Sequence, residues 1–176
     1  YTGNQWQNFY SVGAGWLMSE EEFMKDISWL DMLKLKGSWG TLGNQNLSTA
    51  YPAEPLLKNA YSAIFGKPSI IYPGYQLAYL PNPNLRWEKV EAWEVGFETN
   101  MLRNRLHLEG VFYKKNTKDL LAEVPGISGT IPGIGNLGEI RNSGVELAAT
   151  WRDQIGDWGY SVSANLTTIS NKVKSL

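Results

Sequence analysis

The middle of the chain carries a long two-sided alternation between residues 87 and 115. Large apolar side chains occupy every second position of its first arm, at Trp93, Val95 and Phe97. The pattern restarts after a polar break at 100–103, and its second arm has Leu106, Leu108, Gly110 and Phe112. Because successive side chains of a strand point to opposite faces, this period of two predicts an antiparallel hairpin with one apolar and one polar face.

The length of this hairpin constrains the environment of the chain. Its predicted register joins Thr99 to Asn104 across a four-residue turn. The further pairs are Phe97 with Leu106, Val95 with Leu108, and Glu98 with Arg105. Each arm has about 12 residues, whereas strands of water-soluble domains usually have about 5 or 6. A tilted strand needs about 9–11 residues to cross a membrane, so we expect the apolar face to contact lipid.

The same alternation predicts about six long strands, at 9–18, 33–43, 86–99, 104–115, 143–153 and 158–170. The last two form a second hairpin, in which Trp151 pairs with Tyr160 across a turn at 154–157. The two short turns alternate with long segments at 44–86 and 116–142, which are rich in Pro or Gly and show no periodicity. Short turns on one side and long loops on the other are typical of transmembrane β-barrels. The sequence thus predicts an all-β, antiparallel up-and-down meander.

Residues near the predicted turns fit this topology. Aromatic side chains would gather at the periplasmic rim, where barrels carry a girdle: Trp16, Trp151, Trp158 and Tyr160. Residues 19–26 predict a short helix, with Ser19 as N-cap and Glu22 completing a capping box. Bacterial barrels have at least eight strands, so we expect residues 1–176 to be one segment of a larger barrel domain, continuing at both ends.

Composition excludes several classes of function. The formal net charge is −1 and the basic residues are dispersed, so there is no stripe for nucleic acid. There is no cysteine and a single histidine, His107, so the usual zinc sites cannot form. No window approaches 18 apolar residues, which excludes a transmembrane helix. We expect neither a metal nor a cofactor.

Two patterns resemble catalytic or cofactor motifs. Residues 133–138 match GxGxxG, but a strand-like run follows where a dinucleotide site needs a helix, so turn glycines are the better interpretation. Glu94 would face Glu109, and a carboxylate pair can serve a glycosidase as acid and base. Such carboxylates are also the ordinary wet side of a strand, and nothing in the sequence supplies His107 with triad partners. We therefore expect no catalytic residue and no enzyme activity.

Several runs occur in an order typical of one family. They are LKLKGSWG at 33–40 with GNQ at 43–45, SVGAGW at 11–16, PNPNLRWE at 81–88, YKK at 113–115 with TKDLL at 117–121, and NLGEIRNSGVEL at 136–147. Through these runs the chain resembles the SusC/RagA-type TonB-linked (TonB-dependent) outer-membrane transporters over nearly its whole length.

The resemblance implies a 22-stranded barrel around a plug that lies outside residues 1–176. It implies import of oligosaccharides or peptides across the outer membrane of a Gram-negative bacterium, energised by the TonB–ExbB–ExbD system through the plug. A SusD-like surface lipoprotein would form the lid. In such a protein the first long segment lies on the ligand side. Its amide and aromatic side chains would bind substrate, namely Asn44, Gln45, Tyr61, Tyr72, Tyr75 and Tyr79.

Two other interpretations of the alternation stay open. A water-soluble, carbohydrate-binding β-sandwich would bury the apolar side chains of the central hairpin in a single core: Val95, Phe97, Leu106 and Leu108. A glycoside hydrolase would need Glu94 and Glu109 to line a closed cleft.

Overall fold

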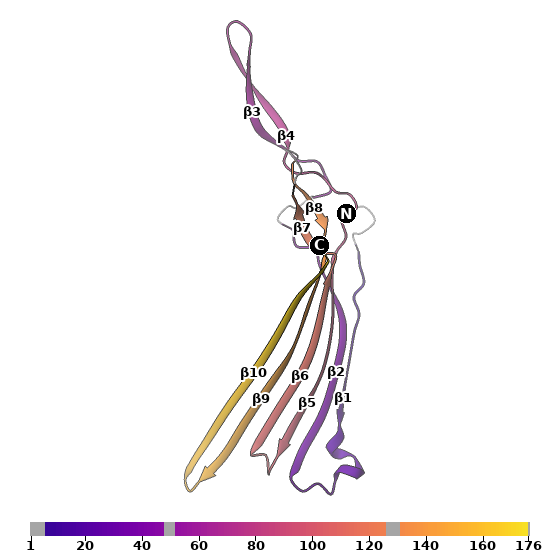
Figure 1. The fold of residues 1–176 in the computed structure, drawn as a ribbon, viewed down its shortest axis with the longest axis vertical. Coiled ribbons are helices and arrows are strands. Elements are labelled where there is room, and N and C mark those ends of the chain that lie inside the picture. The colour runs from indigo at the N-terminus through magenta and orange to yellow at the C-terminus, as the bar shows by residue number, and fades with distance from the viewer. Residues whose placement is uncertain (1–5, 48–51, 126–130, 176) are drawn as a thin grey trace. The chain divides into compact units, whose positions relative to one another are not determined.

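The computed structural model describes residues 6–47, 52–125 and 131–175. The chain forms two compact units. The sheet unit consists of Phe9–Leu42, Val90–Thr117 and Glu139–Leu176, and the loop unit consists of Tyr1–Asn8, Gly43–Lys89 and Lys118–Gly138. The main sheet has six strands in the order β1-β2-β5-β6-β9-β10 (Figure 1). These are β1 (Ser11–Leu17), β2 (Leu30–Asn44), β5 (Glu88–Met101), β6 (Leu106–Lys118), β9 (Glu139–Ile155) and β10 (Trp158–Ser175).

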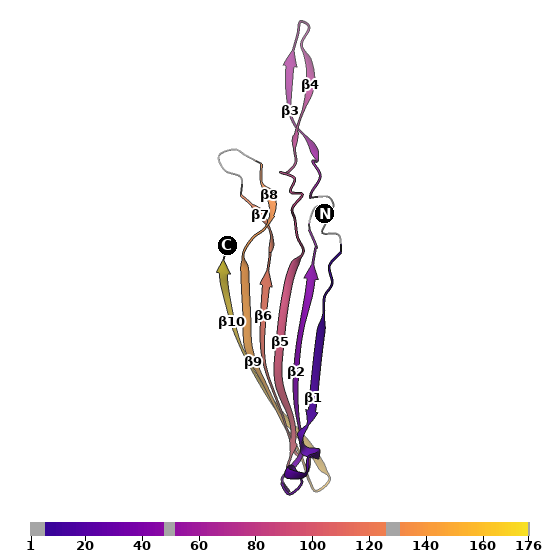
Figure 2. The ribbon, with the colours of Figure 1, turned by 90° about the vertical axis from the view of Figure 1, so that its right-hand side faces the viewer.

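The six strands follow one another across the sheet in chain order, so the predicted antiparallel meander is confirmed. Both views place the β5–β6 and β9–β10 turns, and the short β1–β2 connection, at the same end of the sheet (Figures 1 and 2). Strands β9 and β10 have 17 and 18 residues and so exceed even the predicted lengths.

The sheet is a single layer without an apolar core. Among the described residues, the buried apolar side chains are Leu85 and Pro52, both in the loop unit. On the sheet, apolar side chains that share a face are largely exposed: Val95 is 56% and Leu166 is 59% accessible. A β-sandwich would cover this face with a second sheet about 10 Å away. The sandwich interpretation is therefore not favoured.

The β9–β10 hairpin keeps its predicted faces but not its predicted register. Trp151 pairs with Val162 rather than with Tyr160, because the turn contains two residues rather than four. Gly156 in this turn has φ of +60°, which suits the first position of a two-residue hairpin turn. The shift of two residues is even, so every side chain stays on its predicted face.

The β5–β6 hairpin is shifted by four residues. Its turn spans 102–105 instead of 100–103. A Cβ added to Gly110 would lie 2.5 Å from the ring of Phe97, so Phe97 faces Gly110 rather than Leu106. The predicted pairing of Thr99 with Asn104 is accordingly wrong. This shift is also even, and the apolar and polar faces remain as predicted.

The turn after β5 has an unusual backbone. Leu102, Arg103 and Asn104 have φ of 58°, 62° and 60°, a region that residues other than glycine seldom adopt. The backbone N–H of Leu102 donates to the carbonyl oxygen of Trp29, and that of Asn104 donates to Asp31 Oδ2, both at 2.8 Å. Contacts from Trp29, just before β2, and from Asp31 at the start of β2 thus stabilise the turn, and no local sequence signal marks its position.

The long segments are not structureless. The first contains a hairpin of β3 (Leu57–Phe65) and β4 (Ile70–Leu77), and the second contains a hairpin of β7 (Leu121–Val124) and β8 (Gly133–Asn136). Periodicity is missing from the first hairpin because both of its faces are largely exposed, so no face is selected to be apolar. The glycines of the GxGxxG run lie in β8 and before β9, with no helix after them, so the run has no dinucleotide-site context.

The predicted short helix at 19–26 is wrong. Two 3-10 turns, η1 (Met18–Glu20) and η2 (Glu22–Met24), occupy this stretch, and neither has a side-chain cap hydrogen bond. Ser19 lies inside the first turn, and its buried hydroxyl has no hydrogen-bond partner. A capping box requires the serine to precede the helix, whereas Ser19 lies inside a 3-10 turn. The sequence therefore has the residue pattern of a capping box without the helix that it would cap.

Candidate functional site

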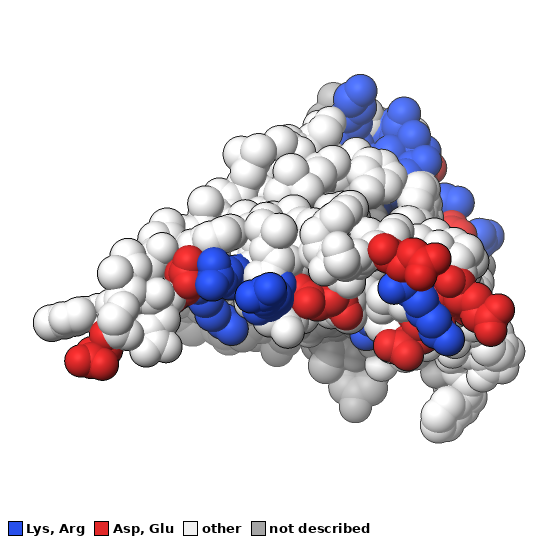
Figure 3. All heavy atoms as spheres, turned by 90° about the horizontal axis from the view of Figure 1, so that it is seen from below, with Lys and Arg blue, Asp and Glu red and all other residues white. Residues whose placement is uncertain are grey.

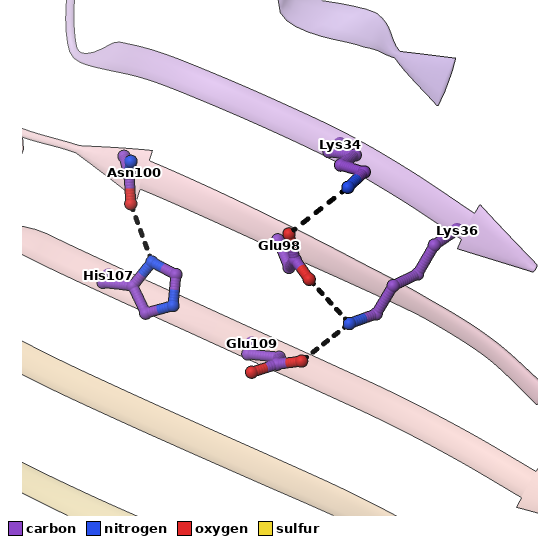
Figure 4. Close-up of polar contacts among 6 residues, drawn as sticks. All are labelled: Lys34, Lys36, Glu98, Asn100, His107 and Glu109. Atoms are coloured by element: carbon purple, nitrogen blue, oxygen red, sulfur yellow. Dashed lines mark hydrogen bonds and ion pairs between the residues drawn. The ribbon is translucent and has the colours of Figure 1, made fainter. Parts of the chain in front are cut away.

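A lysine of β2 joins the central strands on the polar face. Lys36 Nζ donates to Glu98 Oε1 of β5 and to Glu109 Oε1 of β6, each at 2.7 Å (Figure 4). Lys34 Nζ lies 3.8 Å from the other oxygen of Glu98. The three bridged side chains are 32%, 28% and 38% accessible, in the order Lys36, Glu98, Glu109. Water therefore reaches this cluster.

The carboxylate pair predicted at Glu94 and Glu109 does not form. Glu109 is joined through Lys36 to Glu98, whereas Glu94 lines an open hollow of about 100 Å³ beside Lys36 and is part of neither ion pair. Neither carboxylate lies in a closed cleft, so the arrangement that a glycosidase requires is missing.

The single histidine has a structural partner on the same face. His107 Nδ1 lies 2.7 Å from Asn100 Oδ1 on the neighbouring strand (Figure 4). Within residues 6–47, 52–125 and 131–175, no group of three His, Cys, Asp or Glu side chains is arranged to hold a metal ion. The polar face can therefore offer charge and hydrogen bonds to a solute.

The opposite face is apolar across several strands. Trp93 packs edge-to-face on Phe112, with ring centroids 5.4 Å apart. An open hollow of about 320 Å³ extends over β5, β6, β9 and β10, and its apolar lining includes Phe97, Leu108, Leu147, Ala149, Ala164 and Leu166. A broad area without charged side chains is visible in Figure 3, beside rows of Lys, Arg, Asp and Glu. An uncharged area of this extent suits contact with lipid.

Aromatic side chains lie near the short-turn end of the sheet, as predicted for a girdle. Trp158 follows the β9–β10 turn directly and is highly exposed. Tyr160 and Trp151 lie close behind it on the paired strands. Trp16 lies near the end of β1, and its Nε1 donates to Glu21 Oε1 at 2.9 Å. Aromatic rings with one polar contact are typical of a membrane interface.

Asn136 organises the loop unit, and we did not predict its role. Its Oδ1 accepts from the backbone N–H of Arg86 at 2.8 Å, and its Nδ2 donates to the carbonyl oxygens of Arg86 and Asp119, each at 2.9 Å. Asn82 makes a second clamp, with Nδ2 donating to the carbonyl oxygen of Ile134 at 3.0 Å. Both asparagines lie in runs that carry the family resemblance. That resemblance was the signal in the sequence that could have marked them as structurally important.

The predicted substrate-binding residues fall into two groups within the loop unit. Three tyrosines lie on the β3–β4 hairpin and are well exposed: Tyr61, Tyr72 and Tyr75. Tyr79 instead lines a cavity of about 330 Å³ together with Asn46 and Glu123. Asn44 and Gln45 are exposed at the end of β2, and Asn44 Oδ1 accepts from the backbone N–H of Asn46 at 3.0 Å. These residues could stack on and hydrogen-bond a sugar or a peptide.

These features occur together in one known family. The family described as TonB dependent receptor-like, beta-barrel matches residues 1–175. The chain belongs to this family. No helix in the described part of the chain is long and apolar enough to cross a membrane.

Curated relatives and solved structures match across the chain. The TonB-dependent receptor SusC of Bacteroides thetaiotaomicron is 31% identical over 98% of this chain and 18% of its own length. The TonB-dependent receptor P26 of Formosa agariphila is 32% identical over 98% of this chain and 17% of its length. The structure of the RagAB peptide transporter aligns with 100% of this chain and 19% of its matched chain, with a TM-score of 0.84 at 30% identity.

The RagAB peptide importer in its 'open-open' state aligns with a TM-score of 0.78 over 96% of this chain. The predicted resemblance to SusC/RagA-type proteins is thus confirmed. The chain spans about a fifth of the length of these relatives. They are transporters or receptors by description, which agrees with a role other than catalysis.

Proposed function

We propose that residues 1–176 are part of the barrel domain of a SusC/RagA-type nutrient importer in the outer membrane of a Gram-negative bacterium. The apolar face would contact lipid, and the polar face would line the lumen or the plug. The observation that carries the proposal is an uncovered apolar face on a single-layer sheet, opposite a hydrated ion-pair cluster of Lys36, Glu98 and Glu109. The similarity to SusC and to the RagAB transporter along the chain supports it.

The cargo would be an oligosaccharide or a peptide. RagAB is described as a peptide transporter, and the resemblance to SusC-type importers implies oligosaccharides as the other class of cargo. Energy would come from the TonB–ExbB–ExbD system acting through a plug, and a SusD-like surface lipoprotein would cover the long loops. The functional importer would therefore be an assembly, with this chain supplying part of its wall and part of its ligand side.

Substrate would contact the loop unit at Tyr61, Tyr72 and Tyr75 on the β3–β4 hairpin, and at Asn44, Gln45 and Tyr79. The support is chemical: exposed aromatic rings and exposed amide groups bind both sugar rings and peptide bonds. The exposed fraction of Tyr61 is 78%, so its ring is open to a ligand.

The test uses the full-length protein in its own bacterium. Deletion of the gene should abolish growth on one class of nutrient, either a purified oligosaccharide or a peptide mixture, and the same loss should follow deletion of TonB. A triple variant, Tyr61→Ala, Tyr72→Ala and Tyr75→Ala, should slow growth on that nutrient. Lys58→Ala on the same hairpin should not. Recovery of the protein outside the outer-membrane fraction, or unchanged growth of the deletion strain on every oligosaccharide and peptide tested, would contradict the proposal.

A further inference from the structure

Three cations lie on the apolar side of the sheet, at the strand ends remote from the short turns: Lys114 of β6, Arg141 of β9 and Lys172 of β10. Arg141 and Lys172 are direct cross-strand partners. The register between β9 and β10 is unbroken from Trp158 to Val173. Alternation therefore puts Lys172 on the same face as Leu166, and Arg141 on the same face as Leu147.

Contacts confirm that these cations share one face. Arg141 Nε donates to Asn116 Oδ1 at 2.8 Å, across β9 and β6. Lys114 lies two residues before Asn116, and its Nζ is 5.9 Å from the centre of the Trp93 ring. Diagonal neighbours across two strands have Cα atoms about 7–8 Å apart, so Lys114 and Arg141 are within reach of one small anion.

The cluster has an unbalanced charge. Among the described residues, none of the three cations forms an ion pair. Glu139, two residues before Arg141, is the carboxylate at this end of the face of β9, and Glu91 of β5 accepts from Trp39 Nε1 at 3.2 Å. Like charges directly opposite one another destabilise a sheet. An external anion would offset this repulsion, and Arg141 uses one guanidinium nitrogen in its contact with Asn116.

The height of the cluster matches a lipid headgroup. Arg141 precedes Trp151 of the aromatic girdle by ten residues on the same strand. A rise of about 3.4 Å per residue and a tilt of about 40° place Arg141 about 26 Å above that girdle. The apolar band of an outer-membrane barrel is about 25 Å tall. The cations would therefore stand where the hydrocarbon of the outer leaflet ends.

We propose that Lys114, Arg141 and Lys172 bind the phosphorylated sugar headgroup of an outer-leaflet glycolipid, with its acyl chains lying on the apolar face below. This inference rests on the proposed membrane location of the sheet. A phosphate matches the planar fork of an arginine, and two lysines add point charges. The edge of Trp93 and the ring of Phe112 would contact the upper part of the acyl chains.

The test reconstitutes the full-length protein in nanodiscs of phosphatidylcholine that contain lipid A, and native mass spectrometry counts the lipid A bound to each barrel. The double variant Arg141→Gln, Lys172→Gln should bind lipid A about 25-fold more weakly, because each cation near an anionic surface contributes about fivefold. The matched control is Lys115→Gln. Lys115 is adjacent to Lys114 on the same strand, but its side chain belongs to the opposite face, so binding should be unchanged.

The wild-type protein provides a second arm that does not depend on any variant folding. It should bind lipid A in preference to enzymatically dephosphorylated lipid A and to phosphatidylglycerol. Equal binding of lipid A and its dephosphorylated form would overturn the site, as would a double variant that binds like the wild type. Normal insertion and nutrient import by such a variant would leave the proposed function standing. Absence of nutrient import by a wild-type protein that inserts and binds lipid A normally would instead contradict the proposed function alone.

Discussion

Replacement of Lys36 by methionine should destabilise the barrel wall more than any other single lysine replacement on β2. The methionine keeps most of the volume of the lysine stem but removes the ammonium that bridges β5 and β6. Glu98 and Glu109 would then face one another without a counter-ion, with their oxygens at most twice 2.7 Å apart.

The magnitude follows from the two ion pairs and from the repulsion that they suppress. Each pair is about one third exposed, so solvent screening limits it to about 0.5–1 kcal/mol. Two carboxylates about 5 Å apart repel by about 1 kcal/mol in water and about 3 kcal/mol at the effective dielectric of a protein surface. The exposure favours the lower value, so the total cost is about 2 kcal/mol. Lys34 lies 3.8 Å from Glu98 and is more exposed, so Lys34→Met should cost less than about 0.5 kcal/mol.

The assay is urea unfolding of the full-length protein from lipid vesicles, followed by tryptophan fluorescence. Adding Glu109→Gln to the Lys36→Met variant should recover about 1 kcal/mol, because one member of the repelling pair becomes neutral. In 1 M salt the difference between the Lys36 and Lys34 variants should shrink, because the Debye length falls to about 3 Å. Equal stability of these two variants at low salt, or no recovery from Glu109→Gln, would refute the account of this face.

Two further changes test the packing of the sheet and of the loop unit. Gly144→Ala should lower the free energy of unfolding by about 2–3 kcal/mol, because its methyl group would collide with the backbone oxygen of Thr168 and lie 2.7 Å from the Tyr113 hydroxyl. Gly159→Ala, with open space around it, should be neutral in the same urea titration, and equal costs would contradict the predicted close approach. Asn136→Ala removes three hydrogen bonds and should weaken the loop unit by about 2 kcal/mol, measured as faster amide exchange there. Unchanged exchange in the loop unit would show that the clamp is unimportant.

The faces of the sheet were predictable from the sequence, because the face of a side chain depends only on whether its position along the strand is odd or even. The alternation around Val95 and Phe97 assigns the apolar face correctly even though the β5–β6 register was predicted four residues away. The register itself depends on the turn, and Leu102, Arg103 and Asn104 adopt positive φ without any glycine to signal it. The β9–β10 turn did carry such a signal at Gly156, which favours a two-residue turn over the predicted four.

Other features were missed because no buried face imposes a pattern. The β3–β4 hairpin is exposed on both sides, so its apolar and polar residues do not alternate. The sequence did not predict that Glu98 and Glu109 lie close together. Their proximity depends on the β5–β6 register and on Lys36, which comes from a third strand. The clamps at Asn136 and Asn82 join segments about 50 residues apart, which local patterns do not predict.

The most direct test of the two-sided wall uses single cysteines along β10, since the described chain has no cysteine of its own. Each position from 162 to 167 would carry a bimane label in the reconstituted full-length protein, and spin-labelled lipid would quench the fluorescence of labels that face the membrane. Strong quenching should occur at positions 162, 164 and 166, replacing Val162, Ala164 and Leu166, and weak quenching at 163, 165 and 167. Equal quenching at all six positions, or none at any, would contradict a strand with lipid on one side and an aqueous lumen or plug on the other.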